Sequence, residues 1–361
     1  MKAITGRIFI SMVASAGSRG EISTPPPQDI PVTRPPLSAL LMNDAGLEIT
    51  NAAAWFQQRE SFKKQWLDYL GRPLETSAPL KTEVLETEEF PEFTRQRVRY
   101  QIEEGLYTEA YLLTPKGPAG RLPAVVVFHQ TIDSHIRQAA GVDTSDPELM
   151  QGEQLVRRGY LVLCPRCFIF DEGADYAGQV TAMQVRHPEW TGMARMVWDA
   201  RRAADFLVSL PRVDPERIGC MGHSLGAKEV LYAAAFDDRY KASVFNEGGV
   251  GLDFSNWDAP WYLGPGIRKT GFHLEHHQLL ALVAPRSFLL IAGDSADGDR
   301  SRAFIEAALP VFHLLDVPDH LEWLNHHQGH RYPPAARKVA EEFLDLHLKN
   351  PAQAPGETIQ P

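Results

Sequence analysis

The residues best suited to chemistry lie in the run Gly222-His223-Ser224-Leu225-Gly226, which fits the pattern G-x-S-x-G. The apolar residues 218–221 before it predict a strand, and residues 227–235 after it, rich in alanine, predict a helix. A serine at such a bend exposes its hydroxyl at the carboxyl end of the strand, and the flanking glycines let neighbouring backbone approach. We therefore expect Ser224 to be a nucleophile.

A serine hydroxyl is a weak nucleophile unless a base accepts its proton. In the order typical of such sites the base follows the last strand of the sheet. His330 follows a strand predicted over residues 321–324 and precedes the final helix, so it is the expected base. His326 and His327 lie close enough in the sequence to be alternatives.

A carboxylate must also hold the imidazole in the correct tautomer, and the sequence offers two positions for it. The loop after the strand predicted over 287–291 contains Asp297, our first choice, and Asp294, our second. Glu247 follows the strand predicted over 242–245 and would reach the same imidazole from the neighbouring strand end. The choice between Asp297 and Glu247 stays open at this level.

Attack on a carbonyl creates an oxyanion, which two converging backbone N–H groups would stabilise. One is expected from Leu225, directly after the nucleophile, and the other from Gln130 or Thr131, after the strand predicted over 123–128. This chemistry requires neither a metal ion nor an organic cofactor.

The surrounding pattern predicts an α/β fold in which a mainly parallel central sheet carries helices on both faces. Residues 51–70 have aromatic side chains at helical spacing, and residues 83–114 alternate as an antiparallel hairpin does. After Gly120 strands and helices alternate, with helices expected over 149–158, 191–210 and 334–348 and strands over 123–128, 160–163, 218–221, 242–245, 287–291 and 321–324.

The two ends of the chain differ from this pattern. Residues 22–37 contain six prolines, so we expect residues 1–36 to be a flexible extension, 37–350 the catalytic domain and 351–361 a tail. Lys2 and Arg7 precede a short apolar run that ends in Ala14-Ser15-Ala16, a pattern of secretory signals. Export and a cytoplasmic location both remain open.

Composition excludes several classes of function. The 361 residues carry a net charge of -10, which disfavours nucleic acid and anionic membranes as partners. The sequence contains no apolar run long enough to span a bilayer. Its three cysteines, among them the pair Cys164 and Cys167, do not form a disulfide framework and are best explained by packing. A small-molecule or carbohydrate ester is the expected partner, and the oligomeric state stays open.

With these residues placed, the chain resembles the α/β-hydrolase superfamily over residues 37–350, and most closely its acetyl xylan esterase and dienelactone hydrolase-like bacterial members. The stretch from Trp198-Asp199 to Arg217-Ile218-Gly219, the nucleophile run, and Ala284-Pro285-Arg286 are similar to theirs. The resemblance implies two-step hydrolysis of a carboxylic ester, such as an acetylated sugar, through an acyl-enzyme on Ser224.

A second, partial resemblance is to glucuronoyl esterases. Glu247 lies 23 residues after Ser224 and Lys228 lies four after it, as in that family. Leu225, however, stands where those proteins place an arginine. The resemblance implies that Lys228 contacts substrate.

The aromatic segment 254–264 is either a wall or lid of the pocket, in which Trp261 could stack on a sugar or acyl ring, or a packed loop. Two other readings are a peptidase of the prolyl-oligopeptidase type, disfavoured because the chain has no region of propeller size, and a non-catalytic binding protein.

Overall fold

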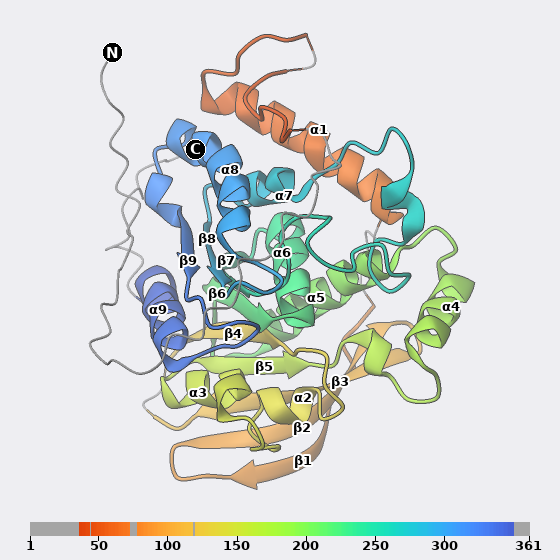
Figure 1. The fold of residues 1–361 in the computed structure, drawn as a ribbon. Helices are drawn as coiled ribbons and strands as arrows, with labels where there is room; N and C mark the ends of the chain where they lie inside the picture. Colours follow the sequence, from red (N-terminus) through yellow and green to blue (C-terminus); the bar gives the residue numbers. More distant parts are fainter. Residues whose placement is uncertain (1–35, 44, 73–77, 118–119, 350–361) are drawn as a thin grey trace, which may run out of the picture.

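The computed structural model describes residues 36–43, 45–72, 78–117 and 120–349, arranged around one twisted sheet (Figure 1). Residues 1–35 and 350–361 lie outside the described residues, and so do the predictions of an N-terminal extension and a C-terminal tail. The strands lie in the order β1-β2-β3-β5-β4-β6-β7-β8-β9. Their bounds are β1 Glu83–Glu89, β2 Phe93–Glu103, β3 Leu106–Pro115, β4 Leu122–Phe128, β5 Leu161–Pro165, β6 Val213–His223, β7 Tyr240–Asn246, β8 Ser287–Ala292 and β9 Leu321–Asn325.

The sheet is parallel from β5 through β4, β6, β7 and β8 to β9. The three strands at the other end, β1 to β3, are antiparallel to their neighbours, as the predicted hairpin requires. Because the carboxyl ends of parallel strands meet at one edge, the loops after β4, β6, β7, β8 and β9 are brought together there. The predicted mainly parallel sheet is confirmed.

Helices cover both faces of the sheet, also as predicted. Alternate residues of β4 pack into two separate apolar clusters: Val125 and Val127 face Leu155 of α3 and Phe343 of α9, whereas Val126 faces the cluster of α5 and α6. The main α-helices are α1 Ala52–Leu70, α2 Ile136–Ala139, α3 Gln151–Arg157, α4 Tyr176–Arg186, α5 Gly192–Ser209, α6 Leu225–Phe236, α7 His276–Val283, α8 Arg302–Leu314 and α9 Pro334–Leu344.

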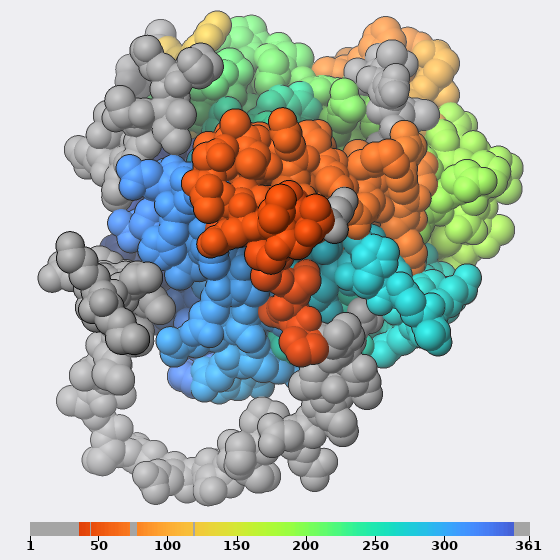
Figure 2. All heavy atoms as spheres, turned by 90° about the horizontal axis from the view of Figure 1, so that it is seen from above, coloured from red at the N-terminus to blue at the C-terminus, as the bar shows by residue number. Residues whose placement is uncertain are grey.

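The helix α1 lies across the top of the molecule, between α8 and the segment that joins β7 to α7 (Figure 2). Its apolar side buries Trp55, Phe62, Trp66 and Leu70. The indole of Trp66 donates a hydrogen bond of 3.0 Å to Gln278 of α7, which satisfies the polar atom of a buried ring. The predicted helix over 51–70 is thus packed on the rest of the domain.

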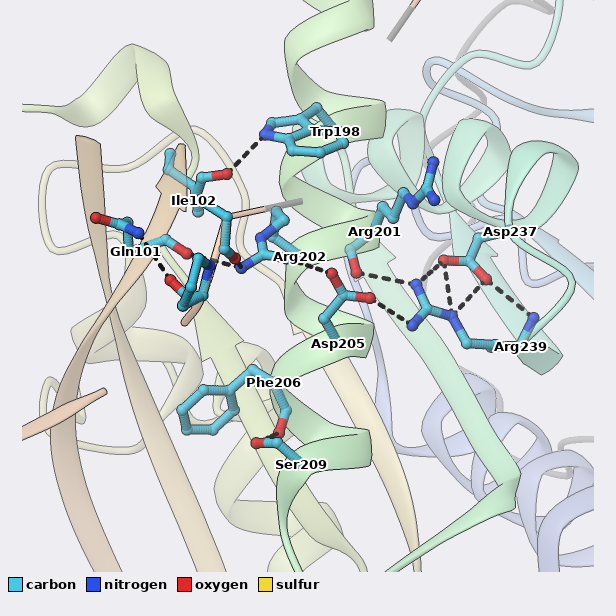
Figure 3. Close-up of polar contacts among 12 residues, drawn as sticks. Gln101, Ile102, Trp198, Arg201, Arg202, Asp205, Phe206, Ser209, Asp237 and Arg239 are labelled. Carbon is cyan, nitrogen blue, oxygen red and sulfur yellow. Dashed lines mark hydrogen bonds and ion pairs between the residues drawn. The ribbon is translucent and has the colours of Figure 1, made fainter. Parts of the chain in front are cut away.

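The long helix α5 is fixed to the antiparallel strands by buried polar side chains (Figure 3). The Trp198 indole donates to the Ile102 carbonyl at 3.0 Å, and the Arg202 guanidinium donates to the Gln101 carbonyl at 3.0 Å. Arg202 also pairs with Asp205 one turn later. A buried guanidinium needs such partners, since an unpaired buried charge is costly.

The sequence prediction differs from the structure in a few elements. The helices α2, α4, α7 and α8 were not predicted, and the final helix ends at Leu344 before a π-helical turn, Asp345–Lys349. All three cysteines are buried and free, consistent with packing. In the part of the chain that the structure describes, no helix has the length and apolarity needed to cross a membrane.

Candidate active site

Ser224 occupies the bend between β6 and α6, with φ 57° and ψ −114°. A non-glycine residue in this backbone region is strained by roughly 1–3 kcal/mol, and such strain is concentrated at functional sites. The surrounding backbone leaves no room for side chains: a Cβ at Gly222 would lie 2.4 Å from the Gly226 carbonyl carbon, and one at Gly226 would lie 2.0 Å from the Phe128 carbonyl oxygen. The two glycines of the motif therefore make the bend possible.

The imidazole of His330 and the carboxylate of Glu247 are in direct contact. His330 Nδ1 lies 3.2 Å from Glu247 Oε2, and the Glu247 side chain is fully buried. A carboxylate only accepts hydrogen bonds, so Nδ1 carries the proton in this pair and Nε2 is left as an acceptor. This is the tautomer that a base for a serine hydroxyl requires.

Glu247 is itself held from the neighbouring loop. Its two carboxylate oxygens accept hydrogen bonds from the backbone amides of Gly293 and Ala296, the latter at 2.8 Å. Glu247 also has a positive φ of 55°, which directs its side chain back toward the end of β8. A buried carboxylate with this number of donors is satisfied and fixed in orientation.

The imidazole of His330 packs against the residue that precedes Ser224. Its ring centroid is 4.6 Å from that of His223, the residue before Ser224, and the Ser224 amide donates to the carbonyl of Asn246, the residue before Glu247, at 2.9 Å. Among the described residues no hydrogen bond joins the Ser224 hydroxyl to His330. Catalytic hydrogen bonds are often long in unliganded enzymes and shorten when substrate binds.

The first choice for the acid, Asp297, is not brought to His330. Its carboxylate oxygens accept from the amides of Gly249 and Val250 and from the Ser301 hydroxyl, the last at 2.7 Å. The loop after β8 turns so that this side chain points into the segment that follows Glu247. The preference for Asp297 over Glu247 is therefore corrected.

The second choice in the same loop, Asp294, pairs with a different histidine. Its Oδ2 lies 2.6 Å from His327 Nδ1 and its Oδ1 accepts from the Asn325 amide at 2.6 Å. This group is exposed. The alternative base His326 accepts a hydrogen bond from the Gln328 amide through its Nδ1. Neither competing histidine has a hydrogen bond to Glu247 in the described part of the chain.

The two expected oxyanion donors come from segments that touch. Leu225 is the first residue of α6, so its amide has no partner within the helix. The start of that helix is pressed on the end of β4 at Gly226, and Gln130 is the second residue after β4. The Gln130 side chain donates a hydrogen bond to Gln138. The alternative donor residue, Thr131, is exposed.

Two supporting groups were not identified from the sequence. His129 accepts the Cys167 amide at Nε2, 3.1 Å away, while its Nδ1 contacts the Gln130 carbonyl at 2.8 Å, and burial lowers the His129 pKa to about 3. A neutral His129 thus fixes the backbone carbonyl of Gln130. On the other side of Ser224, the side-chain amide of Asn246 donates to His223 Nδ1 at 2.9 Å. Neither His129 nor Asn246 belongs to a recognisable motif.

The two residues expected to contact substrate, Lys228 and Trp261, differ in exposure. Lys228 is 3% exposed. Its ammonium donates to the Ser255 hydroxyl at 2.7 Å and lies 4.3 Å from the Trp257 ring centroid. Burial lowers its pKa to about 7. Trp261 is only partly buried and forms one side of an open hollow of about 600 Å³.

The segment 254–264 combines the two alternatives that the sequence left open, a packed loop and a wall of a pocket. Trp257 is fully buried and donates to the Gly249 carbonyl at 2.7 Å, as in a packed loop. Trp261, four residues later, lines a surface hollow, as in a pocket wall.

The strand order, the serine bend and the histidine-carboxylate pair define an α/β-hydrolase, and the comparisons with known proteins agree. The chain has the α/β-hydrolase fold, and residues 108–255 match the model of the Dienelactone hydrolase family. This stretch contains Ser224 and Glu247, and the match confirms the resemblance described from the sequence.

Individual proteins are similar to this chain at low sequence identity. YtaP of Bacillus subtilis (strain 168), described as a hydrolase, is 28% identical over 254 residues, which cover 65% of this chain and 80% of YtaP. A glucuronoyl esterase from Solibacter usitatus superimposes with a TM-score of 0.71 at 18% identity, covering 86% of this chain and 97% of that one. A structure from Bacteroides fragilis NCTC 9343 described as an acetyl xylan esterase gives 0.60 at 15% identity, with 75% of each chain covered.

Proposed function

We propose that the chain is a serine hydrolase that cleaves carboxylic esters carried by carbohydrates, with Ser224 as nucleophile, His330 as base and Glu247 as the carboxylate that orients the base. The observation that supports this most is the bond between Glu247 and His330 Nδ1, which leaves Nε2 available beside a serine at a strained bend. Similarity to the Dienelactone hydrolase family and to the carbohydrate esterases agrees with this reading.

In the first step the Ser224 oxygen attacks the ester carbonyl and its proton passes to His330 Nε2. The carbonyl oxygen becomes an oxyanion near the amides of Leu225 and Gln130. The intermediate collapses, the bond to the alcohol oxygen breaks, and the imidazolium returns the proton to that oxygen as the alcohol leaves. The acyl group is then bound to Ser224.

In the second step water attacks the acyl-enzyme, and His330 takes its proton. Collapse of the second intermediate releases the carboxylic acid and returns the proton to Ser224. Glu247 stabilises the imidazolium in both steps without becoming protonated. Its position in the interior strengthens this interaction, because little water competes with the imidazole for the carboxylate.

A second candidate within the same chemistry is the hydrolysis of uronate esters, as in the glucuronoyl esterase of Solibacter usitatus. Lys228 favours it, since it lies on α6 four residues after Ser224, where glucuronoyl esterases also have a lysine. The leucine at position 225 argues against it, because glucuronoyl esterases have an arginine at the corresponding position.

The test is hydrolysis of p-nitrophenyl acetate, followed by acetylated xylo-oligosaccharides and methyl glucuronate esters, by the wild type and Ser224→Ala. We expect Ser224→Ala to lose at least about 1000-fold in kcat/KM, since the nucleophile and base act as a unit. Unchanged turnover in a folded Ser224→Ala protein would overturn the proposal.

A further inference from the structure

The open hollow beside Trp261 is formed by three segments far apart in the sequence. They are the loop between β4 and α2, with Asp133 and His135, the stretch from Ile169 to Ala177 at the start of α4, and Trp261. In Figure 1 α4 and the segment joining β7 to α7 lie toward the same end of the molecule, the end to which β5 points. The hollow is about 600 Å³, within the range of ligand pockets.

The hollow adjoins the proposed reaction centre. Asp133 lies three residues after Gln130, and the ring of His129 is 5.0 Å from that of Phe170 in its wall. On the other side, Trp261 precedes Tyr262, whose ring lies 4.8 Å from the Lys228 ammonium. A substrate whose ester lies at Ser224 can therefore extend into the hollow past Gln130.

The apolar part of the lining is a row of aromatic rings. Phe170 and Tyr176 have centroids 5.1 Å apart and planes inclined by 58°, and Tyr176 and Trp261 are 5.6 Å apart and inclined by 70°. Each ring meets the next at a steep angle, so the three form a wall of faces and edges. A ring-shaped ligand with an apolar side can pack on such a wall.

The polar part of the lining is acidic. Asp133, Asp171 and Asp175 line the hollow, and its lining contains no lysine or arginine. Carboxylates accept hydrogen bonds from hydroxyl groups and repel anions. An uncharged ring that carries hydroxyl groups satisfies both parts of the lining, whereas a uronate does not.

A small cation is less well matched. Cation–π binding needs a ring face close to the charge, and in this protein Lys228 itself occupies such a place, over Trp257 and Tyr262. In the hollow the rings partly cover one another's faces, and its lining is open on one side.

We propose that this hollow is a subsite for a neutral pyranose ring next to the ester, so that the substrate is an ester borne by a neutral oligosaccharide. The proposal rests on the proposed function for the position of the ester, but not for the binding itself. Asp171 lies deepest in the acidic part, where burial raises its pKa to about 6. It can then act toward a sugar hydroxyl as either donor or acceptor.

The experiment is calorimetric titration of the full chain with three probes: xylotriose as the neutral sugar, tri-galacturonate as the anion and tetramethylammonium as the cation. We expect xylotriose alone to bind. Binding should weaken at least about tenfold in Tyr176→Ala and Asp133→Asn. Phe56→Ala is the matched control, because it removes an exposed aromatic ring on α1 that does not line the hollow. This variant should bind xylotriose as the wild type does.

Ser224→Ala separates this proposal from the proposed function. If it binds xylotriose normally and does not hydrolyse esters, both stand. Turnover by Ser224→Ala would remove the mechanism and leave the subsite. Absence of xylotriose binding, equal binding by the Tyr176→Ala variant, or binding of tetramethylammonium or tri-galacturonate in place of xylotriose would overturn the subsite.

Discussion

Glu247 and Asp297 are a natural comparison, because both are fully buried carboxylates in loops after the neighbouring strands β7 and β8. Each accepts two backbone amides from the other's loop. Glu247 binds Gly293 and Ala296, and Asp297 binds Gly249 and Val250. The two loops are thus held together by a reciprocal pair of side chains.

The difference lies in the third partner. For Glu247 it is the His330 imidazole, whereas for Asp297 it is the Ser301 hydroxyl at the start of α8. The first partner can take up a proton during a reaction, and the second cannot. Burial and backbone hydrogen bonds are common to both carboxylates, so the proposed catalytic role of Glu247 rests on the imidazole that it orients.

The difference between Glu247 and Asp297 is tested most directly by replacing each carboxylate with the corresponding amide. Glu247→Gln should lower kcat/KM for p-nitrophenyl acetate by about 10³- to 10⁴-fold, since an amide no longer stabilises the imidazolium and can favour the wrong tautomer. The far-ultraviolet circular dichroism spectrum should be unchanged.

Asp297→Asn is the matched control, with the same chemical change at an equally buried carboxylate. We expect less than about a tenfold loss in kcat/KM. Stability should fall by about 1–3 kcal/mol in urea unfolding, because one of its buried donors loses an acceptor. A larger loss of activity for Asp297→Asn than for Glu247→Gln would return the acid role to Asp297.

A smaller effect concerns Lys228, whose charge Asp297 favours. Burial lowers the Lys228 pKa from 10.5 to about 7, so between these values the unfolded chain binds the extra proton and the folded chain does not. Stability contributed by this group is therefore lowest below pH 7 and rises with pH above it, by at most about 1.4 kcal/mol per pH unit.

Lys228→Met should remove that slope. Urea unfolding at pH 6, 7, 8 and 9 would show stability rising less steeply with pH in the variant than in the wild type, and the variant should be the more stable at pH 6. Parallel pH profiles for the two proteins would contradict the depressed pKa.

Much of this arrangement follows from the sequence. The bend at Ser224 could be predicted because a strand, a helix and two glycines converge in a few residues, and the place of His330 follows from the order of strands. The choice between Glu247 and Asp297 could not, since both follow parallel strands that end at the same edge of the sheet. It depends on the path of the two loops, which is set by hydrogen bonds between residues distant in the sequence.

The wall of the hollow also could not be predicted from the sequence. The helix α4 buries only Gln179, Val180 and Met183, too few apolar positions to give a clear helical period. Its capping residue Asp175, which accepts the Gly178 amide at 2.8 Å, is the one local signal of a helix start. The aromatic contacts that complete the hollow join Phe170 to Tyr176 and Tyr176 to Trp261, and they appear only in the folded chain.

The most direct measurement of the central claim is covalent labelling by a fluorophosphonate, which reacts with activated serine hydroxyls, followed by peptide mass spectrometry. The account predicts a single adduct on Ser224 in the wild type, almost none in His330→Ala, and slow labelling in Glu247→Gln. An adduct on another residue, or labelling of Ser224 at the wild-type rate in His330→Ala, would contradict it.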